Sequence, residues 1–393
     1  MPIPSSTPTS AAPLPASIQV LGWTDCLQQA EPEWLQLWER TQTSPDLSPM
    51  WARALVAGHQ IDPDTLHVVT ARIAGQLVMV WPLQAQTVRK LGLPCRQIGP
   101  LQNIFCMHGG LLTTLDDATA TRLAFEALRS TKRLRWDWLL LENQVMDTPL
   151  TTAWLSVVEA AACPVVSAAT ECSPYLQHQG SLDELLAARS RNFREKMRAR
   201  LRDLQRDPLL QLDYLQQPED MPRYVDSVLA IERKSWKHAA GSAITSRDWE
   251  TRFYEHLLAQ FAPRGTVVAA VLSHEGTAIA HSLDLVHHGR VYGLKWSFDL
   301  DHAKRRPGVV MMVNRLSKYF GEGCTEFDFL GKNESYKLQW SKTTRDHAAY
   351  KVYAPGLRGR LLHGLDRARA ALKARQQAGQ PEPAAASSPE EQD

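Results

Sequence analysis

A short basic segment near the end of the chain, Lys304–Val310, contains residues suited to binding an anion. Pro307 is favourable in the first turn of a helix, and Gly308 allows a ligand to approach the backbone closely. The free N–H groups and the positive dipole end of a helix start favour a pyrophosphate. The segment therefore predicts a phosphate-binding loop, although a helix start with solvated basic side chains is the simpler alternative. The candidate residues are Arg305, Arg306, Pro307, Gly308, Val309 and Val310.

A second group of polar residues surrounds the end of an expected strand, Glu326–Leu330. Asp328 lies in this strand and Gly331 follows it, with Tyr336, Lys337 and Trp340 shortly after. Ligands in α/β proteins commonly bind at the carboxyl ends of strands. The pattern therefore marks a candidate site. The simpler alternatives are a surface lysine for Lys337 and, for Asp328, a strand residue that faces solvent or forms a salt bridge.

A third group lies on an expected helix before these strands. Glu232 and Trp236 are four residues apart and share one helical face, and Lys237 follows them. Burial in the core is the usual fate of a helical tryptophan. His281, in an expected strand, is a further candidate base, but a hydrogen-bonded core histidine is the commoner role.

The elements that position these residues form a mixed α/β pattern. Strands are expected at Thr266–Leu272, Ala278–Val286 and Arg290–Phe298, followed by a helix from Pro307 to about Phe320 and the strand Glu326–Leu330.

The N-terminal half has a similar order. A hairpin is expected from Leu66–Ile73 and Leu77–Leu83, then an irregular stretch at Gly92–Gly110, a helix at Asp116–Lys132 and a strand at Trp136–Leu141. The repeated order of hairpin, loop, helix and strand predicts a structural duplication.

A helical region separates the two halves. Its first helix, Ser190–Arg206, has apolar residues on one face and a stripe of arginines beside it. Such a stripe can contact nucleic-acid phosphates, although a solvated helix face is more common. Two further helices are expected at Pro222–Trp236 and Ser246–Phe261.

The composition limits the classes of function. The 393 residues exceed the comfortable size of one core, so two domains are expected. A net charge of 44 minus 42, or +2, gives no global sign of a nucleic-acid or membrane protein. Six scattered cysteines argue against a zinc site or a disulfide framework. We expect no signal peptide and no transmembrane segment, and a cytoplasmic location.

These observations divide the chain into five parts. We expect a disordered N-terminus at 1–17, an N-terminal domain at 18–170, a C-terminal domain at 171–355, a basic amphipathic helix at 356–376 and a disordered tail at 377–393. The amphipathic helix carries Leu357, Leu361, Leu365 and Leu372 and is a candidate for contact with a membrane surface.

Taken together, the three groups resemble the CelD-type GNAT acyltransferases of polysaccharide biosynthesis, which are similar to the Fem peptidoglycan transferases. The resemblance covers roughly Ser173 to Tyr353. It implies two facing GNAT-like domains, an acyl donor and an amine acceptor. In the GNAT signature for coenzyme A, Arg305 and Gly308 fit, whereas Val310 replaces a small residue. The matching residues are Arg191–Arg202, Glu232-x-x-Ser235-Trp236-Lys237, Pro307-Gly308, Asp328-x-x-Gly331 and Tyr336-Lys337-x-x-Trp340.

The resemblance implies transfer of an acyl group from acetyl-CoA or another acyl-CoA, without a metal, to an amine of a sugar or cell-envelope precursor. Lys337 would stabilise the oxyanion, Tyr336 would protonate the leaving thiolate, and Glu232 or Asp328 would be the base. Trp236, Lys237, Trp340 and His281 would line the acceptor side. The alternatives are a Fem-type transferase that uses aminoacyl-tRNA and a non-catalytic module of polysaccharide machinery.

Overall fold

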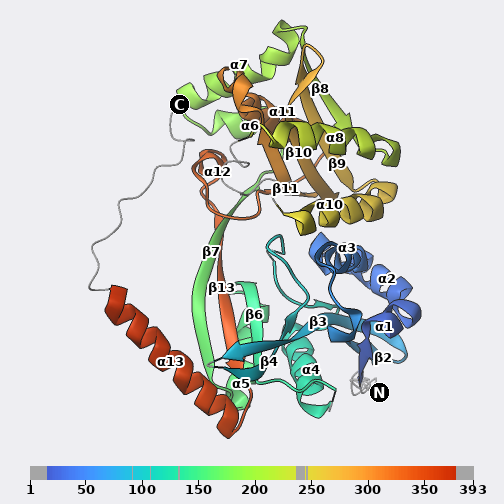
Figure 1. Ribbon diagram of the computed structural model, residues 1–393. Coiled ribbons are helices and arrows are strands. Elements are labelled where there is room, and N and C mark those ends of the chain that lie inside the picture. The colour runs from blue at the N-terminus through green and yellow to red at the C-terminus, as the bar shows by residue number, and fades with distance from the viewer. Residues whose placement is uncertain are drawn as a thin grey trace, which may run out of the picture.

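The protein consists of two α/β halves joined by one continuous sheet (Figure 1). The computed structural model describes residues 16–90, 92–106, 108–131, 133–235, 244 and 247–377. The strands run in the order β1-β2-β3-β4-β6-β13-β7-β12-β11-β10-β9-β8, and β5 pairs with β3. The long strand β7 passes from one half to the other, and β13 runs beside its first part.

The N-terminal half follows the predicted order. The hairpin of β2 and β3 is confirmed, and the predicted helix after Asp116 is confirmed with the Asp116 side chain accepting a hydrogen bond from the Thr119 N–H at 2.9 Å. The elements are β1 (Ser17–Gly22), α1 (Trp23–Gln29), α2 (Glu31–Thr41), η1 (Pro45–Leu47), α3 (Pro49–His59), η2 (Pro63–Thr65), β2 (Leu66–Ile73), β3 (Gln76–Lys90), β4 (Leu93–Pro100), β5 (Leu112–Thr113), α4 (Asp117–Ser130), β6 (Trp138–Val145), α5 (Pro149–Ala160) and β7 (Val165–Gln177).

The C-terminal half also keeps its predicted order, with antiparallel β9, β10 and β11 followed by α11 and β12. The elements are α6 (Leu182–Ala187), α7 (Arg191–Arg206), β8 (Leu210–Leu215), η3 (Pro218–Asp220), α8 (Met221–Glu232), α10 (Asp248–Phe261), η5 (Ala262–Arg264), β9 (Val267–His274), β10 (Thr277–His287), β11 (Arg290–Phe298), η6 (Leu300–Arg305), α11 (Pro307–Gly321), β12 (Glu326–Asp328), α12 (Ser335–Trp340), β13 (Thr344–Tyr353) and α13 (Leu357–Gln377).

Several strands depart from the expected organisation. The stretch predicted to be irregular, Gly92–Gly110, contains β4, and the expected boundary at residue 170 falls within β7. β13 pairs with β6 and with the first part of β7, so it completes the sheet of the N-terminal half. The last part of β7, from Tyr175 to Gln177, pairs with β12 of the C-terminal half. The N-terminal half therefore completes its sheet with β13, a strand from a distant part of the sequence.

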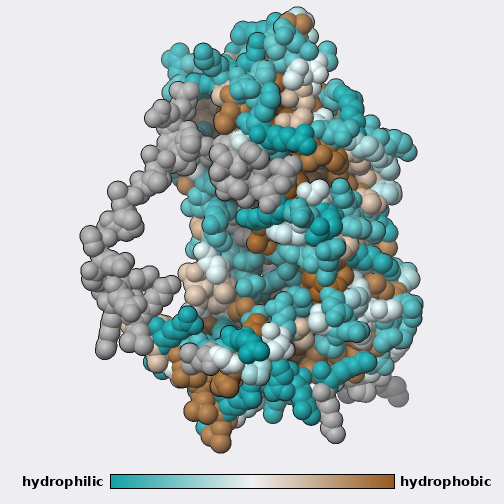
Figure 2. Space-filling model, in the orientation of Figure 1, coloured by the Kyte–Doolittle hydropathy of each residue, from teal (hydrophilic) through white to brown (hydrophobic). Residues whose placement is uncertain are grey.

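The two halves share a hydrophobic core. One cluster of buried side chains combines residues of α2 and α3 with residues of α10, β9, β10 and β11. Trp51 of α3 meets Phe253 of α10 edge to face, with ring centroids 5.3 Å apart. Hydrophilic residues cover much of the outer surface that Figure 2 displays. The shared core fixes the two halves against each other and holds the loops between them in place.

Close approach of α3 and α10 depends on Gly58. A Cβ atom there would lie 2.7 Å from Phe253 Cβ and 2.8 Å from Phe253 Cα, which is backbone and cannot move aside. We expect Gly58→Ala to lower the free energy of unfolding by about 1–3 kcal/mol, the typical cost of overpacking. The matched control is Gly364→Ala in α13, where a Cβ meets nothing within 4 Å and alanine should stabilise by up to about 1 kcal/mol. Equal denaturant midpoints for the two variants would contradict this interpretation.

The expected disordered segments fall almost wholly on residues 1–15 and 378–393, which lie outside the described residues. A helix, α13, is present where the basic amphipathic helix was expected. Among the described residues, no helix is both long enough and apolar enough to cross a bilayer.

Candidate active site between the two halves

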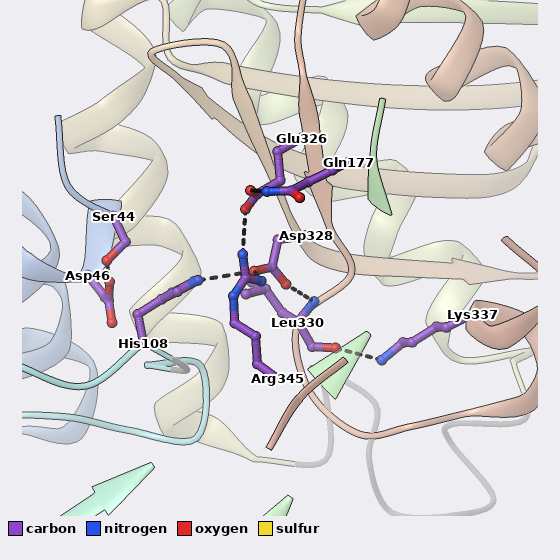
Figure 3. A network of polar contacts seen from close by, with 9 residues as sticks. All are labelled: Ser44, Asp46, His108, Gln177, Glu326, Asp328, Leu330, Lys337 and Arg345. Atoms are coloured by element: carbon purple, nitrogen blue, oxygen red, sulfur yellow. Dashed lines mark hydrogen bonds and ion pairs between the residues drawn. The ribbon is translucent and has the colours of Figure 1, made fainter. Parts of the chain in front are cut away.

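A histidine from one half and an aspartate from the other meet where the halves face each other (Figure 3). His108 lies in the loop between β4 and β5, and its Nε2 is 3.0 Å from Oδ2 of Asp328 at the end of β12. The next residue, Gly109, has a φ of 58°, and a Cβ there would lie 2.6 Å from the side chain of Gln144. Glycine at this position therefore allows the loop to bring His108 close to the sheet.

Asp328 is buried and hydrogen-bonded on both oxygens. It is 1% exposed, and it accepts hydrogen bonds from Arg345 Nη1 at 2.6 Å and from the Leu330 N–H at 2.8 Å. Burial opposes its charge, but the hydrogen bond from His108 and the charges of His108 and Arg345 outweigh this effect and hold its pKa below the usual range. Asp328 is therefore a fixed negative charge at neutral pH.

Arg345 of β13 connects this aspartate to a second buried acid. Its Nη2 lies 2.7 Å from Oε1 of Glu326, and its guanidinium stacks 3.7 Å from the ring centroid of Tyr175. Gln177 donates to the other oxygen of Glu326 at 3.1 Å. These contacts join β7, β12 and β13, so the strands that link the two halves also hold the network rigid.

His108 is partly accessible, with 21% of its side chain exposed. Burial lowers its pKa, but the hydrogen bond and charge of Asp328, together with the charge of Asp46, raise the pKa above the usual value for histidine. Asp46 lies in η1, where Ser44 donates to it, and its own pKa is raised by burial.

The geometry fixes which nitrogen of His108 is available for chemistry. A carboxylate only accepts hydrogen bonds, so Nε2 carries the proton and Nδ1 has a lone pair when the ring is neutral. Nδ1 makes no hydrogen bond to any residue that the structure describes. An Asp–His pair with one ring nitrogen open is an arrangement suited to a general base.

Lys337 lies beside this network rather than in it. Its Nζ donates to the carbonyls of Leu330 at 2.7 Å and Lys332 at 2.9 Å, and it pairs with Glu334 at 2.7 Å. The expected surface or cleft lysine is thus buried beneath the turn after β12, in which Leu330 and Gly331 both have positive φ. Because the Leu330 N–H donates to Asp328, Lys337 supports the position of the aspartate through this turn.

A family comparison covers the C-terminal part of this site. Residues 191–338 match the Acetyltransferase (GNAT) domain family. We call this segment the GNAT domain. It contains Asp328 and Lys337, whereas His108 and Arg345 lie outside it.

Solved structures of similar fold cover both halves. FemX has a TM-score of 0.62 at 11% identity, over 86% of this chain and 98% of FemX. The C-terminal domain of a putative lysylphosphatidylglycerol synthetase from Agrobacterium fabrum has a TM-score of 0.52 at 11% identity, over 88% of this chain and 95% of that one. No curated protein matches the sequence. The expected α/β fold of two GNAT-like halves in a Fem-like arrangement is therefore confirmed.

The basic loop of the GNAT domain begins α11 as expected. Arg305 is exposed and pairs with Asp207 at 3.1 Å, and Arg306 has a φ of 51°. The N–H groups of Val309 and Val310, expected to face a pyrophosphate, donate to the Arg306 carbonyl at 3.0 and 3.1 Å.

Gly308 and Val310 have packing roles in the same loop. A Cβ at Gly308 would lie 2.7 Å from the ring of Trp296, so the glycine is needed for packing against this tryptophan. Val310 is 1% exposed, and its burial in the core explains an apolar residue where the coenzyme A signature has a small one.

Two other candidates lie on α12. Tyr336 accepts a hydrogen bond from Trp296 Nε1 at 2.7 Å, which places its hydroxyl beside the start of α11. Trp340 is a core residue that packs edge to face on Phe193, with ring centroids 5.3 Å apart. The packing of Trp340 is that of a structural residue.

Glu232 and His281 belong to a second buried cluster on the face of the sheet that α8 and α10 cover. Both are 0% exposed, and Nε2 of His281 is 3.5 Å from Oε1 of Glu232. The hydroxyl of Tyr224 is 3.1 Å from His281 Nδ1, and Lys295 pairs with Glu250 at 2.7 Å. Trp236 and Lys237 lie outside the described residues.

Sequence reasoning identified Asp328 but missed its partners. His108 lies 220 residues earlier in a stretch read as an irregular loop, and Arg345 lies in a strand that was not expected. A histidine directly before Gly109-Gly110 was the only local signal for His108.

Proposed function

We propose that the protein is an N-acyltransferase whose reaction takes place at the His108–Asp328 pair. The observation that carries this proposal is a histidine held by a buried, charged aspartate, with its second nitrogen open, between two GNAT-like halves. The pair unites the GNAT domain with the N-terminal half, so neither half is sufficient for the reaction.

In this reaction an amine attacks the carbonyl carbon of an acyl donor. The new N–C bond forms as the bond to the leaving sulfur or oxygen breaks. The amine must lose a proton, and His108 Nδ1 accepts it while the charge of Asp328 stabilises the resulting imidazolium. The leaving thiolate or alkoxide takes up a proton; the hydroxyl of Tyr336 is our candidate donor.

We propose acyl-CoA as the donor, with the GNAT domain as its binding site. Two features support this choice. Arg305 and Arg306 lie before the start of α11, and both are basic, although Arg305 also pairs with Asp207. In addition, β12 pairs with β11 only at Arg290–Tyr292, and among the described residues no strand continues this pairing toward Phe298. An unpaired strand edge can hydrogen-bond to the amides of a pantetheine arm.

Aminoacyl-tRNA remains the second candidate donor, because α7 carries an exposed row of arginines. Several of them are already paired within the protein, including Arg191 with Glu195 at 2.7 Å and Arg198 with Asp183 at 2.9 Å. This internal pairing leaves less charge for nucleic-acid phosphates, so we favour the coenzyme A thioester. We further propose a cytoplasmic protein that modifies an amine of a sugar or cell-envelope precursor, on the family resemblance alone.

Thermal unfolding with and without ligand tests the donor. Acetyl-CoA at about 100 times its Kd should stabilise the folded protein by about 2.7 kcal/mol through mass action. Arg305→Gln together with Arg306→Gln should reduce this shift, whereas Arg360→Gln on α13 should leave it unchanged. Stabilisation by aminoacyl-tRNA alone would favour the second donor. A melting temperature unaffected by either ligand would indicate the non-catalytic alternative.

A further inference from the structure

One side of α13 exposes a row of leucines although the helix is firmly attached to the protein. Leu357, Leu361 and Leu365 have exposed fractions of 80%, 70% and 42%. They recur every four residues and so form one stripe along the helix. Exposed leucines at this spacing differ from the isolated apolar residues that are normal on a protein surface.

Contacts on the adjacent face fix the orientation of α13. Asp366 pairs with Lys351 at 2.9 Å, and its pKa is about 2 because ion pairs and hydrogen bonds outweigh its partial burial. Arg358 pairs with the buried Asp137 at 3.0 Å, and Leu362 is 6% exposed in a cluster with Tyr353. The leucine stripe is therefore held facing outward by the packing of the neighbouring face.

The surface around the stripe is apolar and basic. The Pro94 carbonyl accepts a hydrogen bond from Arg358 at 3.0 Å, which brings Leu93, 62% exposed, to the first turn of α13. Figure 2 shows hydrophobic residues gathered at the lower end of the molecule, where α13 begins in Figure 1. Beside Pro355 a surface hollow of about 410 Å³ is lined in part by Arg96, Arg129 and Arg135.

The helix itself adds to this charge. The sequence of α13 contains six Lys or Arg residues and a single acid, Asp366, which is already paired with Lys351 and Lys90. Arg360 and Arg367 are exposed and lie on the other side of the leucine stripe from the attached face. Apolar residues flanked by cations are the chemistry that recognises a bilayer with anionic headgroups.

We propose that this end of the N-terminal half is a docking surface for an anionic membrane. The leucines would enter the headgroup region while the arginines contact lipid phosphates. A second copy of the chain fits less well, because a symmetric contact would place the arginines of the two copies against one another. The inference is independent of the proposed acyl transfer, since it concerns only α13 and the loops beside it.

Co-sedimentation with vesicles of phosphatidylglycerol and phosphatidylcholine, in a ratio of about 1:2, tests the proposal. We expect the protein to bind these vesicles, to bind pure phosphatidylcholine weakly, and to be released by high salt. The triple variant Leu357→Ser, Leu361→Ser, Leu365→Ser should bind at least about tenfold more weakly. The matched control is Leu209→Ser with Leu300→Ser, which replaces leucines of 49% and 47% exposure in the C-terminal half.

A variant that removes charge separates the contribution of the arginines to vesicle binding from that of the leucines. Arg129→Gln with Arg135→Gln should weaken binding to the anionic vesicles and leave the weak binding to pure phosphatidylcholine unchanged. Unchanged melting temperatures of all variants will show that they remain folded. Binding of the leucine triple variant equal to wild type, or no binding of wild type to anionic vesicles, would overturn the proposal. A dimer in light scattering that the triple variant abolishes would also overturn it, by identifying the stripe as a self-interface.

Discussion

Replacing His108 with glutamine should lower turnover by about 10²- to 10⁴-fold, the usual contribution of a general base. Glutamine keeps a polar side chain of similar size that can donate to Asp328, but it cannot accept the proton of the attacking amine. His108 is partly exposed, so folding should be preserved. Steady-state kinetics of acyl transfer to an amine acceptor measure the loss, and His256→Gln, an exposed histidine of α10, is the matched control.

The same variant should change the pH dependence. A general base must be neutral, so kcat/KM of the wild type should rise with pH as His108 loses its proton. Because its pKa is raised, the midpoint of the rise should lie above about 6.5, the ordinary value. The residual kcat/KM of His108→Gln should not show this rise with pH. A variant with full turnover and an unchanged pH profile would exclude His108 as the base.

The free energy of unfolding should also depend on pH through His108 and Asp328. A group whose pKa is higher in the folded state than in the unfolded state stabilises the fold below the unfolded pKa. The contribution of His108 should therefore be lost as pH rises through its folded pKa. Asp328, whose pKa is lowered, should behave in the opposite way and lose its contribution as pH falls through its folded pKa.

Replacing Lys337 with methionine should destabilise the protein and lower turnover together. The methionine leaves the Leu330 and Lys332 carbonyls without their donor, and a buried unsatisfied polar group costs about 1–3 kcal/mol. Loosening this turn also disturbs the hydrogen bond that Asp328 accepts from the Leu330 N–H. Denaturant midpoints and turnover should be measured on the same samples.

The neighbouring lysine provides the control for this prediction. Lys332 lies in the same turn with 75% of its side chain exposed, so Lys332→Met should change stability by less than about 0.5 kcal/mol. If Lys337→Met were as stable as wild type but lost about 10²-fold in turnover, Lys337 would act directly on the developing oxyanion. That result would restore the role that the sequence resemblance implied for it.

Local signals in the sequence predicted local structure well. The turn at Ala74-Gly75 and the helix start at Pro307-Gly308 both lie where expected, because turn and capping preferences act over a few residues. The strand expected at Glu326–Leu330 is also present, as β12, which ends at Asp328.

Contacts between residues far apart in the sequence could not be predicted from these local signals. β7 and β13 pair across roughly 170 residues, and no turn between them specifies their register. His108 and Asp328 are brought together only by the packing of the two halves. The burial of Lys337 depends on a turn in which Leu330 and Gly331 both have positive φ. Of these two residues, only the glycine indicates a positive φ from the sequence.

The late position of β13 in the sequence also has a consequence for folding during synthesis. During synthesis the N-terminal half emerges first. Its strand β6 can pair with β4 on one side, but it lacks its neighbour on the other side until β13 appears about 200 residues later. In the interval β6 presents an open edge, which is a hazard for aggregation. We therefore expect the first half to reach its native form only late in translation. The two halves of this protein therefore cannot fold one after the other as independent domains during translation.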